Sequence, residues 1–258
     1  MEVADYIEIV VSEGDRFAVA AERGGLSVDI STCEGWDMRQ LVRHLGLIHL
    51  WAAANVAYPS DAWLDVDDLG VLADYWPDLA SSWPEDTELV SWYRQTNANL
   101  ARVLESAPAD VECFTFLPAP TPLTMWARRQ AAELAIHRFD AETSRGITSH
   151  FAPQFSADML DELLTGFAPM QTGLAGGAER VLHVHAQDVD EHWYVTIGLH
   201  NIETSREGRK ADLAATGTAA DLNLLLWNRT PDSTVTLTGD TDLMDIWRTG
   251  QRVEWAGA

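Results

Sequence analysis

The sequence predicts an α+β protein in which a four-helix bundle is followed by a smaller domain of mixed helices and strands. Residues 1–148 contain four long segments with apolar side chains at helical spacing, whereas residues 149–258 contain short runs that alternate like strands. Between them, Gly146 to Pro153 has the composition of a linker. We therefore expect two domains, a helical bundle at 1–148 and an α+β domain at 149–258.

Composition narrows the classes of function. Hydrophobic residues make up 47% of the 258 residues, which is typical of a folded chain with a sizeable core. The formal net charge of -23 opposes binding to nucleic acid or to anionic membranes. No apolar run is long enough to cross a bilayer, and the acidic N-terminus is unlike a secretory signal, so we expect a cytoplasmic protein. Its two cysteines, Cys33 and Cys113, are too few for a disulfide framework or a four-thiolate zinc site.

Four amphipathic helices are predicted in the first domain. The first runs from about Asp5 to Arg23 and is stopped by Gly24 and Gly25. Asp37 is a good N-cap for a second helix that continues toward Ala57. The third and fourth helices are expected at Glu88–Ser106 and Met125–Arg145. Between the second and third lies a long acidic connection, Tyr58 to Thr87, whose Trp63, Trp76 and Trp83 are candidates for a pocket wall, although core packing is their commoner use.

The second domain is predicted to combine helices with short strands. Helices are expected at Ala157–Gly173, Ala219–Trp227 and Asp240–Arg248, and strands at Arg180–Ala186, His192–His200, Leu213–Gly217 and Thr234–Thr238. Alternation places His183 and His185 on one face of their strand, which we interpret as a solvated face.

Glu133 and His137 are the candidate centre of the first domain. Spaced i and i+4, they project from one face of the fourth helix, about one turn apart, where both can reach a zinc-sized cation. Such pairs also occur on solvated helices, where the two side chains only stabilise each other electrostatically. A metal would need a third ligand from another helix, and His44 is the best donor. His49 is about 140° further round the second helix, so we interpret it as flanking the site.

Two other groups near this pair have open interpretations. Asp140 follows His137 by three residues, either as a hydrogen-bond partner that orients the imidazole or as an ordinary solvated helix residue. Arg128 and Arg129 precede the pair by about one turn, and although one of them could meet an anionic thiol cofactor, we interpret both as surface residues.

Two segments carry a resemblance to a known family. They are Glu34 to Gly46, with the sequence EGWDMRQLVRHLG, and Ala131 to Glu142, with the sequence AAELAIHRFDAE. With them the chain resembles the mycothiol-dependent maleylpyruvate isomerase family, which is part of the larger group of DinB-like metal-binding bundles. The resemblance implies zinc, or another divalent metal, held by His44, Glu133 and His137, with mycothiol as the thiol cosubstrate.

A weaker part of the resemblance, near Asp221 to Arg229 and Val235 to Asp240, concerns the second domain. It implies a C-terminal α+β domain of the family type, in which Arg229 faces the substrate and has a catalytic role. The residue-level alternative is that Arg229 is a cation near a helix C-terminus, where it interacts with the helix dipole.

Three protein ligands leave a zinc ion an open position, as in catalytic sites. A thiol bound there would lose its proton near neutral pH and become a nucleophile. Addition to a conjugated cis-alkene, rotation and elimination would give an isomerase, and addition or displacement alone an S-transferase, which we favour. The alternatives are a zinc-dependent hydrolase that uses water, and a non-catalytic metal-dependent protein that binds a small molecule or partner. The expected partners are a small electrophile and a low-molecular-weight thiol, with the chain a monomer or homodimer.

Overall fold

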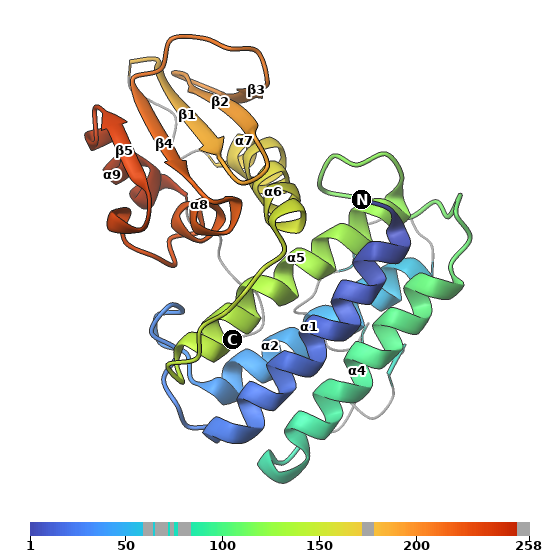
Figure 1. Cartoon of the computed structure of the whole chain (residues 1–258). Coiled ribbons are helices and arrows are strands. Elements are labelled where there is room, and N and C mark those ends of the chain that lie inside the picture. Colours follow the sequence, from blue (N-terminus) through green and yellow to red (C-terminus); the bar gives the residue numbers. More distant parts are fainter. Residues whose placement is uncertain (59–63, 65–71, 73–74, 77–83, 172–177, 252–258) are drawn as a thin grey trace. The chain divides into compact units, whose positions relative to one another are not determined.

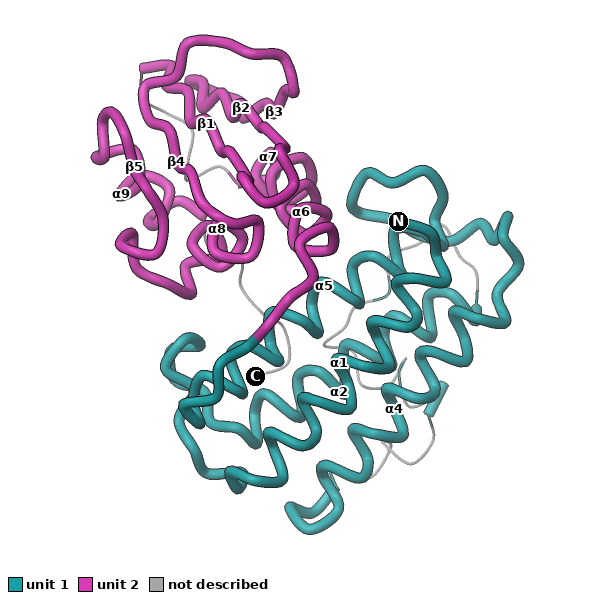
Figure 2. Tube along the Cα trace, in the orientation of Figure 1, with its two compact units in different colours: residues 1–149, 255–258 teal, residues 150–254 magenta. Residues whose placement is uncertain are grey.

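A computed structural model describes residues 1–58, 64, 72, 75–76, 84–171 and 178–251, and it confirms the α+β class (Figure 1). The chain divides into two compact units, residues 1–149 with 255–258 and residues 150–254 (Figure 2). Most of the predicted acidic connection, including Trp63 and Trp83, lies outside the described residues. No helix among the described residues is long and apolar enough to span a membrane.

Unit 1 confirms the predicted helical bundle. Its long helices are α1 (Val3–Gly24), α2 (Met38–Ala57), α4 (Asp86–Ser106) and α5 (Pro122–Thr143). α1 and α2 each pack against both α4 and α5, so they lie at opposite corners of the bundle (Figure 1). This arrangement brings side chains of α2 and α5 together in the bundle core.

Local sequence fixes where the two site-bearing helices begin. The Asp37 carboxylate accepts the Gln40 backbone N–H at 3.0 Å, and the Gln40 side chain accepts the Asp37 N–H at 2.8 Å, so the predicted cap is a complete capping box. The Thr121 hydroxyl accepts the Thr124 N–H at 3.1 Å, and Pro122 opens α5, where its missing N–H costs nothing. Both starts are therefore anchored by side chains.

A glycine of α2 allows α4 to approach closely. A Cβ atom added at Gly46 would lie 2.1 Å from a ring carbon of Trp92, far inside van der Waals contact. Gly46 is two residues after His44, so this contact holds the central part of α2 against α4. Gly46, the last residue of the first family-like segment, therefore leaves room for the Trp92 ring.

Buried charges link α5 to α1. The Arg138 side chain is 1% exposed and donates to Glu13 of α1 and to Glu142, one turn further along α5. Burial raises the pKa of the Glu13 carboxyl in spite of its contact with Arg138. Because a helix with buried polar residues on several sides lacks a clear apolar stripe, α5 is less amphipathic than a surface helix.

Unit 2 is built around a five-stranded sheet, formed in the described residues in the order β3-β2-β1-β4-β5. The strands are β1 (Arg180–Ala186), β2 (Glu191–Ile197), β3 (Ile202–Ser205), β4 (Leu213–Gly217) and β5 (Thr236–Gly239). β1 and β4 are parallel, and the other neighbouring pairs are antiparallel. The helical elements are α6 (Pro153–Glu162), the π-helical turn η2 (Leu163–Phe167), α7 (Ala168–Met170), α8 (Ala219–Leu226), the 3-10 turn η3 (Asp232–Thr234) and α9 (Asp242–Gly250).

Some of the predicted boundaries in unit 2 were wrong. The strand expected to reach His200 ends at Ile197, because Gly198 N–H bonds to the carbonyl of Asn201 and turns the chain into β3, a strand that alternation did not reveal. The strand expected from Thr234 begins at Thr236, after the 3-10 turn η3. The predicted helix from Ala157 begins at Pro153, since proline is well suited to a first helical position.

Candidate metal centre

Three side chains that were predicted as metal ligands come together between α2 and α5. Glu133 Oε1 lies 3.0 Å from His44 Nε2 and 3.3 Å from His137 Nε2. Glu133 and His137 share one face of α5 at i and i+4, and His44 enters from α2. The side chains of both histidines are fully buried, and that of Glu133 is 5% exposed. The solvated-helix interpretation of the pair is therefore wrong.

The spacing of these atoms suits a zinc-sized ion. Ligands held at about 2.0–2.1 Å from a tetrahedral metal lie about 3.3 Å from one another. The donor atoms of His44, Glu133 and His137 all lie within 4.8 Å of one another. Two imidazoles and one carboxylate are also the donor types that bind zinc in catalytic sites, with a position left for a small molecule. The residues present therefore fit a divalent metal.

Arg129 anchors the second oxygen of Glu133. Its Nη2 donates to Glu133 Oε2 at 2.6 Å, and both side chains are buried, so the prediction that Arg129 is a surface residue was wrong. Burial by itself raises the pKa of the Glu133 carboxyl, but Arg129 and the two histidines outweigh it and hold the pKa well below the usual range. Glu133 is thus kept ionised, with Oε1 directed at the histidines.

Asp140 and Cys33 anchor His137 on its other side. His137 Nδ1 lies 2.9 Å from Asp140 Oδ2, which also accepts the Cys33 thiol at 3.3 Å. Burial by itself lowers the pKa of His137, but Asp140, Cys33 and Glu133 raise it well above the ordinary value. A carboxylate on the far nitrogen is the usual orienting partner of a metal-binding histidine, which favours that interpretation of Asp140 over a solvated residue.

Sequence reasoning missed Cys33 and the position of Trp36. Backbone hydrogen bonds between Ile30 and Trp36 fold the segment before α2 into a tight turn. This turn brings the Trp36 ring to 5.0 Å from the His44 ring and 6.4 Å from the His137 ring. The available signal was sequence proximity, because Cys33 immediately precedes the first family-like segment.

His49, which was expected to flank the site, is 1% exposed on α2. Neither ring nitrogen has a hydrogen-bond partner in the described part of the chain. Burial, followed by the nearby charge of His44, lowers the pKa of His49 to about 3. His49 is therefore a neutral imidazole close to the three predicted ligands.

Two family models match the chain. Residues 9–142 match the model of the mycothiol maleylpyruvate isomerase N-terminal domain, and residues 154–245 match the MDMPI C-terminal domain. The chain belongs to the mycothiol maleylpyruvate isomerase family. Both domains of this enzyme family are present.

Solved structures share the fold of the family. The mycothiol-dependent maleylpyruvate isomerase is 14% identical with a TM-score of 0.60, over 92% of this chain and 93% of the other. A histidine-to-alanine mutant of that enzyme is 13% identical over the same shares, also with a TM-score of 0.60. No curated protein sequence matches significantly. At this identity the structures establish the fold and leave the substrate open.

Arg229, the residue that the family resemblance assigns to catalysis, lies just after α8 in unit 2. Its Nη1 donates to the carbonyl of Trp227 at 2.9 Å, and its backbone N–H bonds to the carbonyl of Leu224. These contacts are those of a cation at a helix C-terminus, the alternative interpretation from the sequence. The substrate contact stays a prediction.

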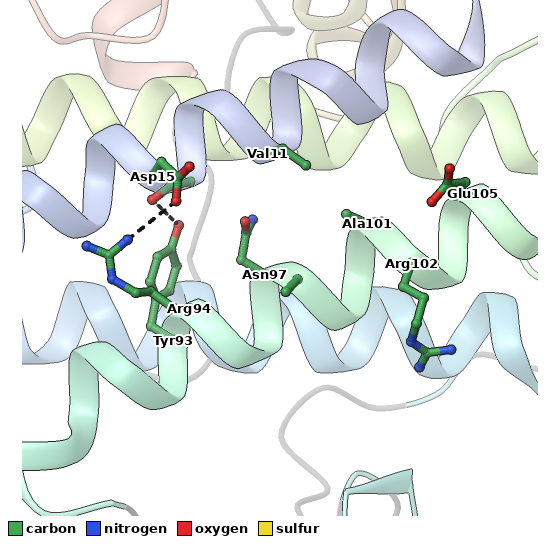
Figure 3. A pocket seen from close by; sticks show the side chains of 10 residues that line it. Val11, Asp15, Tyr93, Arg94, Asn97, Ala101, Arg102 and Glu105 are labelled. Atoms are coloured by element: carbon green, nitrogen blue, oxygen red, sulfur yellow. Dashed lines mark hydrogen bonds and ion pairs between the residues drawn. The ribbon is translucent and has the colours of Figure 1, made fainter.

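A cavity of about 280 Å³ lies elsewhere in unit 1, between α1 and α4 (Figure 3). Asn97 of α4 points toward α1, and Arg94 pairs with Asp15 at 3.4 Å at one end of the cavity (Figure 3). The residues that line it do not include the three predicted metal ligands.

Proposed function

We propose that this member of the mycothiol maleylpyruvate isomerase family is a divalent-metal enzyme that uses mycothiol as the nucleophile toward a small electrophile. His44, Glu133 and His137 hold the metal, with zinc as the best candidate. The observation that carries the proposal is Glu133 Oε1, which lies 3.0 Å and 3.3 Å from imidazole nitrogens on two different helices. A divalent cation in such a site lowers the pKa of a bound thiol, so that the thiolate is available at neutral pH.

The surrounding residues prepare this site for one cation. Arg129 occupies Glu133 Oε2, which leaves Oε1 for the metal and limits how far the carboxylate can rotate. Asp140 holds His137 through Nδ1, so that Nε2 faces Glu133. The ligand rotamers are thus fixed by hydrogen bonds before any substrate arrives, which reduces the entropic cost of forming the site.

An external thiol fits the chain better than an internal one. The Cys33 thiol donates a hydrogen bond to Asp140, which is also hydrogen-bonded to His137. Burial raises the pKa of the Cys113 thiol, which keeps it protonated and unreactive. Neither cysteine of the sequence is therefore set up as the nucleophile, and the thiol named in the family description fills that role.

The family name favours cis–trans isomerisation over the S-transfer that we favoured from the sequence. In isomerisation, thiolate sulfur adds to one carbon of a conjugated cis-alkene and the electron pair of the double bond moves into the conjugated group. The former double bond then rotates, and elimination re-forms it as the trans-alkene and expels the thiolate. In S-transfer the carbon–sulfur bond is retained in the product. Under either outcome, Arg229 is our proposed contact for an anionic group of the substrate. A cytoplasmic location and a monomeric or homodimeric state also stay predictions.

The test measures metal content and thiol-dependent turnover together. Wild type, His44→Ala and Glu133→Gln are loaded with zinc, dialysed, and assayed against a panel of conjugated cis-alkenes and halides with and without mycothiol. His200→Ala is the matched control, because His200 is exposed in unit 2. We expect one metal per chain to be lost in both site variants, with turnover reduced at least 100-fold, while the control retains both.

The same assay distinguishes the alternatives. Turnover that needs metal but not thiol would contradict the thiol-dependent proposal and support the hydrolase. Equal metal content in wild type and both site variants would contradict the metal assignment. Arg229→Ala should raise KM for anionic substrates more than it lowers kcat, and an unchanged KM would leave Arg229 with the helix-end role alone.

A further inference from the structure

The β1–β2 hairpin of unit 2 carries a second group of histidines, unrelated in sequence to the first. Leu182 and Val184 of β1 and Trp193 of β2 face the core, so the residues that alternate with them face outward. On this outer face, His185 lies directly opposite His192, and His183 lies opposite Tyr194. Asp190 occupies the turn that joins the two strands.

The donor atoms of this group converge at the turn. Asp190 Oδ1 lies 3.7 Å from His185 Nε2 and 3.7 Å from His192 Nε2. The donor atoms of these three residues all lie within 4.8 Å of one another. The two imidazole rings are stacked, with centroids 4.0 Å apart and planes 13° apart, so a rotation of the partly exposed side chains is needed to aim both lone pairs at one ion.

One of these nitrogens is shielded from water and lacks a hydrogen bond. His185 Nε2 is buried and has no hydrogen-bond partner in the described ranges. A buried polar atom that makes no hydrogen bond costs free energy, which a bound cation would recover. The unsatisfied His185 Nε2 therefore indicates that this group binds a ligand.

His183 prepares His192 for the same role. His183 Nε2 lies 2.9 Å from His192 Nδ1, which leaves His192 Nε2 on the side of Asp190. An imidazole that binds metal through Nε2 carries its proton on Nδ1, and here that proton would be donated to His183. Stacking on Tyr194 at 4.4 Å holds His183 in place.

The backbone of Asp190 is also unusual. Its φ of 54° is in the left-handed region, which aspartate tolerates better than most residues but glycine adopts without strain. Its carboxylate is 91% exposed, and His185 and His192 are its ion-pair partners among the described residues. The neighbouring cation Arg206 pairs with Asp161 and Glu191 and stacks on the Trp193 ring.

We propose that His185, Asp190 and His192 form a separate binding site for a divalent first-row metal such as Zn²⁺, with His183 as the residue that orients His192. Two imidazoles and a carboxylate are suitable donors for zinc, copper or nickel, and water completes the coordination. Asp190 Oδ1 lies 3.7 Å from each imidazole Nε2, and the donor atoms of the three residues lie within 4.8 Å of one another, so side-chain rotation would bring them to the roughly 3.3 Å of a tetrahedral site. The site does not depend on the function proposed for the first unit.

The experiment uses the full chain, stripped with a chelator and equilibrated with Zn²⁺ alone. Metal content is measured for four proteins: wild type, His44→Ala, and the derivative of each that also carries His192→Asn. We expect His192→Asn to remove one zinc per chain in both backgrounds, whether or not the first site binds. Asp190→Gly should remove the same zinc while relaxing the turn, and His200→Asn should remove none. His183→Asn should weaken binding about tenfold or more.

A ¹⁵N spectrum of the histidine rings supplies an independent readout. On addition of Zn²⁺ to His44→Ala, the Nε2 signals of His185 and His192 should shift, and the Nδ1 signal of His192 should remain that of a protonated nitrogen. Equal zinc content with and without His192→Asn, or loss equally caused by His200→Asn, would overturn the proposal. Retention of the zinc in Asp190→Gly would overturn the assignment of the carboxylate.

Discussion

Imidazole and carboxylate side chains gather in both units, in opposite surroundings. In unit 1, Glu133 lies between His44 and His137 in the bundle core, and all three side chains are at most 5% exposed. In unit 2, Asp190 is 91% exposed at a hairpin turn beside His185 and His192. The donor types are similar, so the difference lies in burial and in the neighbours. The first group therefore contributes to the stability of its unit, whereas the second is a surface feature.

The neighbours explain why the buried group keeps its charge. Burial alone would neutralise Glu133, but Arg129 is paired with it in the same environment. On the hairpin, the side chain of Asp190 is exposed to water, so its charge needs no such partner. A substitution should therefore cost much more in the bundle than on the hairpin.

The largest effect is expected for Glu133→Gln in the metal-free protein. The change leaves the buried Arg129 guanidinium without this carboxylate, and breaking a buried pair from one side costs about 3–5 kcal/mol of unfolding free energy. Urea unfolding followed by circular dichroism measures the loss. The matched control is Glu22→Gln, because Glu22 pairs with Arg94 on the surface, and its loss should cost less than about 1 kcal/mol. Equal costs would refute the contrast.

His49 in the bundle core makes the stability of the protein depend on pH. The folded protein keeps His49 neutral because burial lowers its pKa to about 3, whereas the unfolded chain binds a proton below a pH of about 6.5. The free energy of unfolding therefore falls as the pH drops below 6.5, by up to about 1.4 kcal/mol per pH unit from this residue.

His49→Leu should remove this contribution. Between pH 6.5 and 5, the variant should lose about 2 kcal/mol less stability than wild type, as measured by urea unfolding at each pH. His200→Leu, at an exposed histidine, should follow wild type. If His49→Leu instead loses as much as wild type, His49 does not stay neutral in the fold.

Asp140→Asn should weaken metal binding while the bundle stays folded. The amide can still accept a hydrogen bond from His137 Nδ1, but it no longer supplies the negative charge that raises the basicity of this ligand. Loss of such a partner lowers metal affinity by about 10–100-fold. Competition with a zinc chelator measures the affinity. Asp110→Asn, at an exposed aspartate, is the control, and equal affinities in the two variants would remove Asp140 from the site.

The sequence predicted the α+β class, the bundle and the residues that meet between α2 and α5. Periodicity located the helices, Asp37 located the start of α2, and the i, i+4 spacing placed Glu133 beside His137. Their role as ligands stays a prediction until metal is measured.

Other features depended on contacts that a linear pattern does not show. Arg129 was interpreted as a surface residue, but only tertiary packing decides which arginine of this helix is buried. Cys33 reaches Asp140 across 107 positions of sequence. On the hairpin, alternation predicted a shared face for His183 and His185, but the position of His192 opposite His185 depends on the register of β1 and β2.

The smallest effect is expected for His192→Asn on the hairpin. Without added metal, loss of this partly exposed imidazole should change the free energy of unfolding by no more than about 0.5 kcal/mol, as is usual for a surface substitution. Leu182→Ala, at a fully buried position on the adjacent strand, should cost about 2–5 kcal/mol by comparison.

Added Zn²⁺ should then raise the stability of the His44→Ala protein but not that of the same protein carrying His192→Asn, because only a ligand that binds the folded state stabilises it. A cost above 2 kcal/mol for His192→Asn without metal would show that the hairpin histidines stabilise the fold, as the bundle group does, and the contrast between the two units would fail.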